Sequence, residues 1–313
     1  MDLESCLPAN LRGPATTINR IGIGQSGAGV YRVDAAGEAY VLKIAAAEEP
    51  AAGWLGKLHV QQLASDAGLA PRIVHADEKR RAVVSAFVTD RSFPALYGNP
   101  GTREAALAQL GRVLRRVHEL PLPADAEAKD PRELLAATSS SLAESIALPA
   151  LVAEAVGRVM QEEPPPGGRA AVLSHNDVNP TNLAFDGEAL LLLDWDTAGP
   201  NEPFYDLATI SVFLRMDEET CGRLLAAYDG EPVSTLPDRF AYDRRLVAAL
   251  CGAAFLNLAR LCGHTDATGT ETSEATPSLG EVYQQLRSGS LSLDTAEGRW
   301  GFGLALMKGS LSL

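Results

Sequence analysis

Residues 173–196 constrain the fold of this 313-residue chain more than any other segment. Their first part (LSHNDVNPTN) places polar side chains between two short apolar runs, 170–173 and 183–185. After a short Asp-Gly turn, four leucines lead to a carboxylate at Asp194, as in a buried strand that ends at a polar site. The pattern predicts a β-hairpin that brings the polar residues at the ends of its strands to one point, because the turn is tight.

Three of these polar residues have the chemistry that phosphoryl transfer from ATP requires. An attacking hydroxyl needs a carboxylate to orient it and to accept its proton, and we assign this role to Asp177. The triphosphate needs Mg²⁺, which prefers oxygen ligands, and Asn182 and Asp194 supply an amide and a carboxylate oxygen. His175 is expected to be a structural residue, since Asp177 already provides the base.

A glycine-rich segment near the N-terminus, residues 22–30 (GIGQSGAGV), contains the pattern GxGxxG. A dinucleotide-binding loop runs from a strand into a helix, but here two alternating strands follow, over 30–33 and 40–44. This order disfavours an oxidoreductase and predicts a β-hairpin that covers nucleotide phosphates; a glycine-rich hairpin without a ligand is the alternative. The residues assigned to the phosphates are Gly24, Ser26, Gly27 and Gly29.

Lys43 interrupts the second of these strands (VLKI) with a charge. Burying an ammonium group is costly unless it meets an anion, so we predict that Lys43 pairs with the phosphates of ATP. A lysine that reaches solvent from an edge strand is the alternative interpretation.

The remaining sequence predicts an α+β fold with two lobes. After the glycine hairpin come a helix and two strands, and from about residue 100 apolar residues recur at helical spacing. A small antiparallel sheet is therefore expected in the N-terminal lobe, residues 1–88, and a larger, mainly helical C-terminal lobe over residues 89–313. The predicted elements are a helix over 51–67, strands over 71–76 and 81–88, a helix over 105–120 and a loop over 263–280.

Composition and charge exclude some classes of function. The formal net charge of −13 argues against a nucleic-acid-binding protein and is compatible with a cationic small-molecule substrate, although surplus acidic residues also serve solubility. The apolar run 246–256 is flanked by arginines and is too short for a membrane span, so it is predicted to be a core helix. Residues 1–12 lack a secretory signal, which favours a cytoplasmic protein without membrane insertion.

With these motifs, the chain resembles the aminoglycoside phosphotransferase and choline kinase superfamily over most of residues 20–215. Residues 24–33 (GQSGAGVYRV) are similar to the nucleotide loop of aminoglycoside 3′-phosphotransferases. Residues 173–208 (LSHNDVNPTNLAFDGEALLLLDWDTAGPNEPFYDLA) resemble bacterial choline kinase-like and thiamine kinase-like members. The resemblance implies a protein-kinase-like two-lobed fold that binds nucleotide in the N-terminal lobe, with ATP and Mg²⁺ as cofactors.

The resemblance also implies roles for individual residues. Asp177 would be the catalytic base, Asn182 and Asp194 would bind Mg²⁺, and Lys43 would hold the ATP phosphates. Asp206 would support the catalytic loop.

Asp196 stands where many relatives carry Glu, and would assist a second metal or face the substrate. Ser85 and Phe87 belong to the segment that would contact adenine through backbone groups. One departure is that relatives carry a Glu in the first N-lobe helix to pair with the strand lysine, whereas residues 56–59 (GKLH) contain none.

The substrate predicted from these features is a small molecule. Only eleven residues separate Asp194 from Asp206, too few for the activation segment with which protein kinases dock a peptide. Aromatic residues such as Trp195 and Tyr205 would surround a quaternary ammonium, unless they are ordinary core residues. Choline or ethanolamine is the first choice of acceptor, followed by thiamine and an aminoglycoside; the alternative of another class is a catalytically inactive nucleotide-binding pseudokinase.

Overall fold

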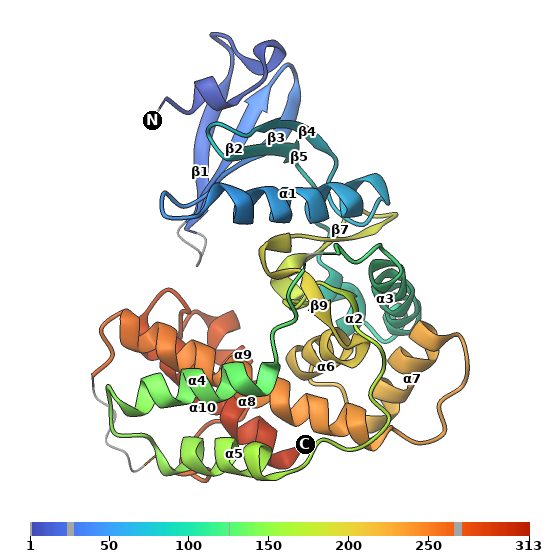
Figure 1. The fold of residues 1–313 in the computed structure, drawn as a ribbon, viewed down its shortest axis with the longest axis vertical. Coiled ribbons are helices and arrows are strands. Elements are labelled where there is room, and N and C mark those ends of the chain that lie inside the picture. Colours follow the sequence, from blue (N-terminus) through green and yellow to red (C-terminus); the bar gives the residue numbers. More distant parts are fainter. Residues whose placement is uncertain (1, 24–27, 125, 266–270) are drawn as a thin grey trace. The chain divides into compact units, whose positions relative to one another are not determined.

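The computed structural model describes residues 2–23, 28–124, 126–265 and 271–313 of the chain (Figure 1). A five-stranded antiparallel sheet lies in the N-terminal part, and most of the later elements are helices. The predicted α+β class is therefore confirmed. In the described part of the chain, no helix is long and apolar enough to cross a bilayer.

The chain packs into two compact units, each with a hydrophobic core of its own. The first contains Met1–Ala124 and His175–Ala198, so the polar segment around Asp177 packs with the sheet. The second contains Asp125–Ser174 and Gly199–Leu313 and is mainly helical. The boundary predicted at residue 88 separates a nucleotide-binding lobe from a substrate-binding lobe. The division into compact units does not test where nucleotide and substrate bind, so this boundary stays a prediction.

The five strands of the sheet follow the order β1-β2-β3-β5-β4 and are all antiparallel to their neighbours. A two-residue turn joins β2 to β3 at Ala36 and Gly37, where φ is 53° and 81°. Two consecutive positive φ values give the turn whose twist matches that of a hairpin. The strands are β1 (Thr17–Ile23), β2 (Gly29–Ala35), β3 (Glu38–Ile44), β4 (Ile73–Asp77) and β5 (Ala82–Ala86).

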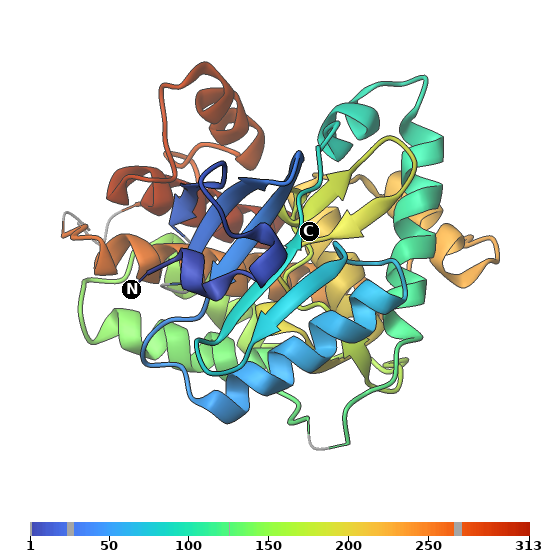
Figure 2. The ribbon, with the colours of Figure 1, turned by 90° about the horizontal axis from the view of Figure 1, so that it is seen from above.

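Side chains of β3 alternate between the two faces of the sheet, as in any strand. Leu42 and Ile44 are buried on one face, beneath two 3₁₀ turns near the N-terminus, Glu4–Cys6 and Ala9–Leu11 (Figure 2). Lys43 lies between these two residues and therefore points to the opposite face.

Three α-helices lie among the described residues of the first unit. α1 (Ala51–Asp66) lies on the other side of the sheet from the N-terminal turns (Figure 1). It ends before Gly68, whose φ of 68° suits a residue that terminates a helix, and it matches the predicted helix to within one residue. α2 (Phe93–Gly98) precedes α3 (Arg103–His118), whose leucines form the predicted buried stripe.

The predicted hairpin of the polar segment is present. β7 (Leu183–Phe185) pairs with β8 (Leu190–Leu192), and the first residue of β7 lies opposite the last residue of β8. A 3₁₀ turn, η3 (Pro180–Asn182), precedes β7, and another, η4 (Trp195–Thr197), follows β8. The register therefore places both turns at the same end of the hairpin.

In the second unit, α8 (Asp238–Leu261) packs along α10 (Ala296–Ser312). A Cβ atom at Gly303 would lie 2.9 Å from the carbonyl oxygen of Gly252, so the absence of side chains lets the two helices approach closely. The core helix predicted over 246–256 lies within α8 and is confirmed. The other elements are α4 (Pro131–Ala143), α5 (Ala150–Gln161), β6 (Val172–Ser174) paired with β9 (Gly199–Asn201), α6 (Pro203–Phe213), α7 (Glu218–Asp229) and α9 (Leu279–Ser288).

Candidate active site

The carboxylate of Asp177 is held by two asparagine side chains. Asn179 Nδ2 donates to Asp177 Oδ1 over 2.8 Å, and Asn182 Nδ2 donates to Asp177 Oδ2 over 2.7 Å. A carboxylate oxygen has two lone pairs, so each oxygen keeps one for a further donor. The group is therefore oriented and still able to accept a proton.

Burial is the main influence on the ionisation of Asp177. It raises the pKa of this carboxyl above the usual aspartate value, and the nearby charge of Asp194 acts in the same direction. The hydrogen bonds from Asn179 and Asn182, and the proximity of His175, oppose this increase. A carboxylate with a raised pKa is a stronger base than an exposed one.

Asn179 was not identified from the sequence, although it contacts Asp177 directly. Its amide oxygen accepts hydrogen bonds from the backbone N–H and the hydroxyl of Thr181, at 2.9 and 2.6 Å. These bonds fix the orientation of the amide, so that its N–H₂ group faces Asp177. The Asn-Pro sequence at this position signals such a turn, because an asparagine side chain commonly caps the backbone two residues later.

His175 and Trp195 connect the start of the polar loop to the end of β8. His175 is fully buried, its Nε2 lies 2.9 Å from the carbonyl oxygen of Leu193, and its ring meets that of Trp195 edge-on at 4.8 Å. The indole N–H of Trp195 donates to the carbonyl of Leu192 over 3.0 Å, and the side chain is 2% exposed. The core interpretation of Trp195 is therefore favoured over contact with a substrate.

Two residues of this site have left-handed backbone conformations. Asn176, next to Asp177, has φ 64°, and Asp194 has φ 58°. Such values are uncommon outside glycine and cost energy, so they persist where the surroundings impose them and are frequent at functional sites. The backbone N–H of Leu193 donates to the carbonyl oxygen of Asn182 over 2.8 Å, which joins the two turns at the end of the hairpin.

Lys43 reaches the same place from the sheet. Its Nζ lies 2.7 Å from Asp194 Oδ1 and 2.7 Å from Asp196 Oδ1. Burial alone would lower the pKa of the lysine, but the two carboxylates outweigh it and raise that pKa above its ordinary value. The sheet lysine and the strand-end carboxylates, which the sequence places far apart, are thus brought together.

Helix α1 supplies no glutamate to Lys43. Within α1 the sequence reads AAGWLGKLHVQQLASD, with a single acidic residue, Asp66, at its end. Glu49 precedes the helix and pairs instead with Lys57 at 2.6 Å. Lys43 is therefore held by Asp194 and Asp196 in this structure.

The donor set at the end of the hairpin suits Mg²⁺. Because Asn182 uses its N–H₂ group on Asp177, its amide oxygen is left for another partner, and the side chain of Asp194 is 50% exposed. The described residues contain no group of three or more His, Cys, Asp or Glu that would hold a metal by themselves. Mg²⁺ usually takes only one or two protein carboxylates and completes its shell with water and nucleotide phosphates, so these residues fit it.

The other predicted nucleotide contacts are described in part. Gly24, Ser26 and Gly27 lie outside the described residues. At Gly29, a Cβ atom would lie 2.8 Å from the ring of Tyr31, so a larger residue there would require the tyrosine side chain to move.

Pairing with β3 limits which backbone groups around Ser85 and Phe87 are left to contact adenine. Ser85 is buried and pairs with Val41 of β3. The N–H of Phe87 donates to the carbonyl of Ala39 over 3.0 Å. An adenine at this strand end would therefore use carbonyl groups or the N–H of Val88.

Tyr205 and Asp206 belong to α6 in the second unit. Asp206 is fully buried, and Tyr205 is half-buried against the hydrophobic core of that unit. Three further aromatic side chains of the second unit, Phe204, Trp300 and Phe302, are all at most 6% exposed and belong to its core.

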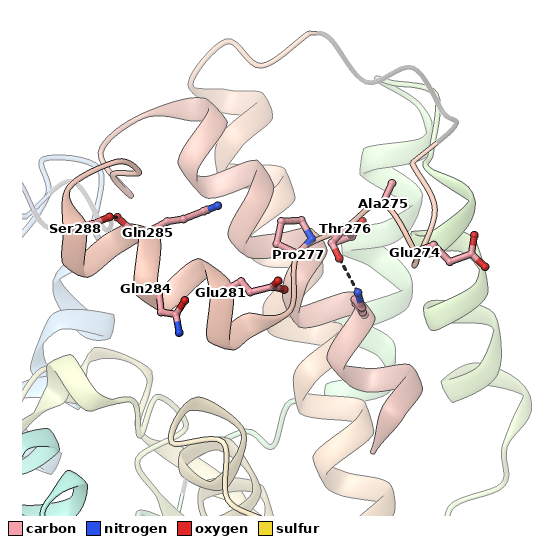
Figure 3. A pocket seen from close by; sticks show the side chains of 9 residues that line it. Glu274, Ala275, Thr276, Pro277, Glu281, Gln284, Gln285 and Ser288 are labelled. Carbon is pink, nitrogen blue, oxygen red and sulfur yellow. Dashed lines mark hydrogen bonds between the residues drawn. The ribbon is translucent and has the colours of Figure 1, made fainter.

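The second unit also contains a cavity of about 600 Å³ between the loop before α9, α9 itself and the side of α10 (Figure 3). Its lining is polar and contains two carboxylates, from Glu274 and Glu281, and no aromatic ring. Lys308 also lines the cavity, and its Nζ donates to the carbonyl of Thr276 over 2.6 Å. None of the catalytic, nucleotide, metal or substrate residues predicted from the sequence lines this cavity.

A family model described as the phosphotransferase enzyme family matches residues 17–260. The chain belongs to this family. The matched range contains every site residue predicted from the sequence, and the predicted membership of the aminoglycoside phosphotransferase and choline kinase superfamily is confirmed.

A curated relative matches this chain over a short stretch. Protein LicA of Haemophilus influenzae is 35% identical over 54 residues, which are 17% of this chain and 20% of LicA. The chain thus aligns with about a fifth of the length of the curated relative that it matches.

Solved structures resemble this phosphotransferase over most of its length. A choline/ethanolamine kinase family protein from Mesorhizobium loti has a TM-score of 0.61 at 19% identity, covering 96% of this chain and 90% of its own. An aminoglycoside-3′-phosphotransferase of type VIII has a TM-score of 0.55 at 22% identity, covering 76% and 95%. At these identities the likeness concerns the fold, and it confirms the predicted kinase-like architecture.

Proposed function

We propose that this phosphotransferase is a small-molecule kinase that transfers the γ-phosphoryl group of ATP to a hydroxyl group. The observation that carries the proposal is the arrangement around Asp177. Its carboxylate is oriented by Asn179 and Asn182, and Asn182 is joined through the backbone to the residue before Asp194. Phosphoryl transfer depends mainly on positioning and charge, which this arrangement supplies.

Each of these residues has a distinct proposed role. Asp177 accepts a hydrogen bond from the acceptor hydroxyl and takes its proton as the oxygen attacks. Asn182 and Asp194 hold Mg²⁺, which neutralises charge on the triphosphate when it is bound. Lys43 binds phosphate oxygens from the sheet side of the site, since its ammonium already lies beside Asp194. His175 and the buried Asp206 are proposed as supports for the loop.

A cationic amino-alcohol such as choline or ethanolamine is the proposed acceptor. The net charge of −13 favours positive ligands near the surface, and the similar structure from Mesorhizobium loti is a choline/ethanolamine kinase family protein. Thiamine remains an alternative on the sequence resemblance alone. An aminoglycoside is the alternative that the type VIII phosphotransferase structure favours.

A catalytically inactive nucleotide-binding protein is the alternative from another class. The lack of a glutamate in α1 favours it, because a lysine without an anchor would bind phosphate poorly. The pairing of Lys43 with two aspartates and the orientation of Asp177 both oppose it.

The test is ADP release from Mg·ATP in the presence of choline, ethanolamine, thiamine, kanamycin and several sugars. We expect one amino-alcohol to stimulate release, and its O-methyl ether, which lacks the hydroxyl, to have no effect. Stimulation by kanamycin alone would identify an aminoglycoside, and not an amino-alcohol, as the acceptor. Nucleotide binding without stimulation by any compound would contradict kinase activity toward all the proposed acceptors.

A further inference from the structure

Asp196 contacts Lys43 as closely as Asp194 does, but in a less exposed position. Both carboxylates lie 2.7 Å from the ammonium. The side chain of Asp194 is 50% exposed, whereas that of Asp196 is 26% exposed and that of Lys43 is 25% exposed. The pair between Lys43 and Asp196 is therefore the more sheltered of the two, and solvent screens it less.

Asp194 cannot be the lasting partner of Lys43 if it binds Mg²⁺ during the reaction. When a carboxylate coordinates a divalent cation, the positive charge of the cation compensates its negative charge. The carboxylate then attracts an ammonium group less strongly. Lys43 is largely buried and needs another anion to keep its place before the phosphates arrive. Helix α1 offers none along its length before Asp66.

The turn that carries Asp196 is fixed on both sides. Trp195 is buried in the core before it, and the hydroxyl of Thr197 donates to the carbonyl of His175 over 3.1 Å after it. The side-chain amide of Asn176 donates to the carbonyl of Thr197 over 3.0 Å, and α1 packs against the same turn. The Asp196 carboxylate is thus presented to Lys43 by a rigid segment.

We propose that Asp196 is the positioning residue for Lys43: it pairs with the ammonium while Asp194 binds metal, and so keeps the lysine aimed at the nucleotide phosphates. This inference rests on the proposed function. It assigns Asp196 neither to the metal nor to the acceptor, and it predicts that every effect of Asp196 on nucleotide binding passes through Lys43.

A double-mutant cycle tests this coupling, with the dissociation constant of Mg·AMP-PNP measured by calorimetry. Asp196→Asn should weaken binding about tenfold when Lys43 is present and less than about twofold in a Lys43→Met background, because the interaction is then already lost. Asp196→Glu should restore binding to within about threefold of wild type, since the carboxylate is kept. Glu188→Gln, which removes an exposed carboxylate eight positions away, is the matched control and should leave binding unchanged.

A second measurement covers the possibility that Lys43→Met disturbs folding. In urea unfolding without nucleotide or metal, Asp196→Asn should lower the midpoint in the wild-type background and have a smaller effect beside Lys43→Met. The inference would be overturned if Asp196→Asn weakened nucleotide binding equally in the wild type and in the Lys43→Met background. A raised Mg²⁺ requirement in Asp196→Asn would also overturn it. If the wild-type protein binds no Mg·nucleotide, that result would instead contradict the proposed function and, with it, this inference.

Discussion

Asn182 donates its side-chain N–H to Asp177 Oδ2 over 2.7 Å, and its own backbone carbonyl accepts the N–H of Leu193 over 2.8 Å. One asparagine thus links the carboxylate proposed as base to the strand end that carries Asp194. Because its side-chain N–H₂ group donates to Asp177, its amide oxygen is left for a further partner. Asn182 thus orients the proposed base together with Asn179, and its amide oxygen is the metal ligand proposed above.

Asp177→Asn is expected to abolish turnover and keep nucleotide binding. The amide cannot take the hydroxyl proton, and loss of a general base lowers kcat by at least about a hundredfold. The dissociation constant of Mg·ATP should stay within about threefold of wild type, because Asp177 is not proposed to contact the nucleotide. Steady-state kinetics with calorimetry measure both quantities, and a kcat close to wild type would refute the role of Asp177.

Asn179→Ala tests the residue that the sequence did not reveal. The variant loses the 2.8 Å hydrogen bond to Asp177 Oδ1 and keeps the bond from Asn182. We expect kcat to fall about tenfold while KM for ATP changes little, because the base is held less firmly and the nucleotide contacts remain. An unchanged kcat would show that one amide is enough to orient the carboxylate.

The hairpin and the strand lysine were predictable from the sequence because both follow local rules. Alternation along β3 sets the face on which Lys43 lies, and the tight turn sets the register of β7 and β8. The partners of Lys43 were not predictable, because Asp194 lies 151 positions further along the chain and no local pattern indicates such a contact. The bond between Asn179 and Asp177 depends on the path of the loop, which the residue types alone leave open.

The sequence did not reveal the burial of the N-terminal turns, and for Trp195 it left core packing and substrate contact both open. The N-terminal turns cover a face of the sheet with Cys6 and Leu7. This burial could not be predicted, because so short a segment shows no hydrophobic periodicity. Trp195, considered for substrate binding, is buried because its ring packs on His175. Whether an aromatic residue faces a cavity or a core depends on tertiary packing, which composition does not encode.

The contact between α8 and α10 predicts opposite effects for two nearby glycines. A Cβ atom at Gly303 would lie 2.8 Å from Leu256 Cγ, whereas at Gly301 it would meet nothing within 4 Å. Gly303→Ala should lower the free energy of unfolding by about 1–3 kcal/mol through overpacking. Gly301→Ala should raise it by roughly 0.5 kcal/mol, because alanine favours the helix. Urea unfolding measures both, and a change of the same sign in the two variants would contradict the packing described.

The pH dependence of stability should depend on Asp243 in α8. Burial raises the pKa of this carboxyl to about 7, with Arg239 opposing and Glu202 adding to the increase. Between about pH 4 and pH 7 the folded protein then holds a proton that the unfolded chain has released, so the free energy of unfolding falls as the pH rises. Asp243→Asn should remove a fall on the order of 4 kcal/mol across this range. Urea unfolding from about pH 5 to about pH 8 provides the comparison, and parallel curves for the two proteins would exclude a raised pKa.

The most direct test of the central claim is transfer of label from [γ-³²P]ATP to the acceptor hydroxyl, measured for the wild type and for Asp177→Asn in parallel. We expect the wild type to produce a labelled phosphate ester of an amino-alcohol, and Asp177→Asn to produce none while still binding Mg·ATP. Equal labelling by both proteins would contradict the assignment of the base. Binding of Mg·ATP by the wild type without transfer to any tested hydroxyl would contradict the kinase reaction.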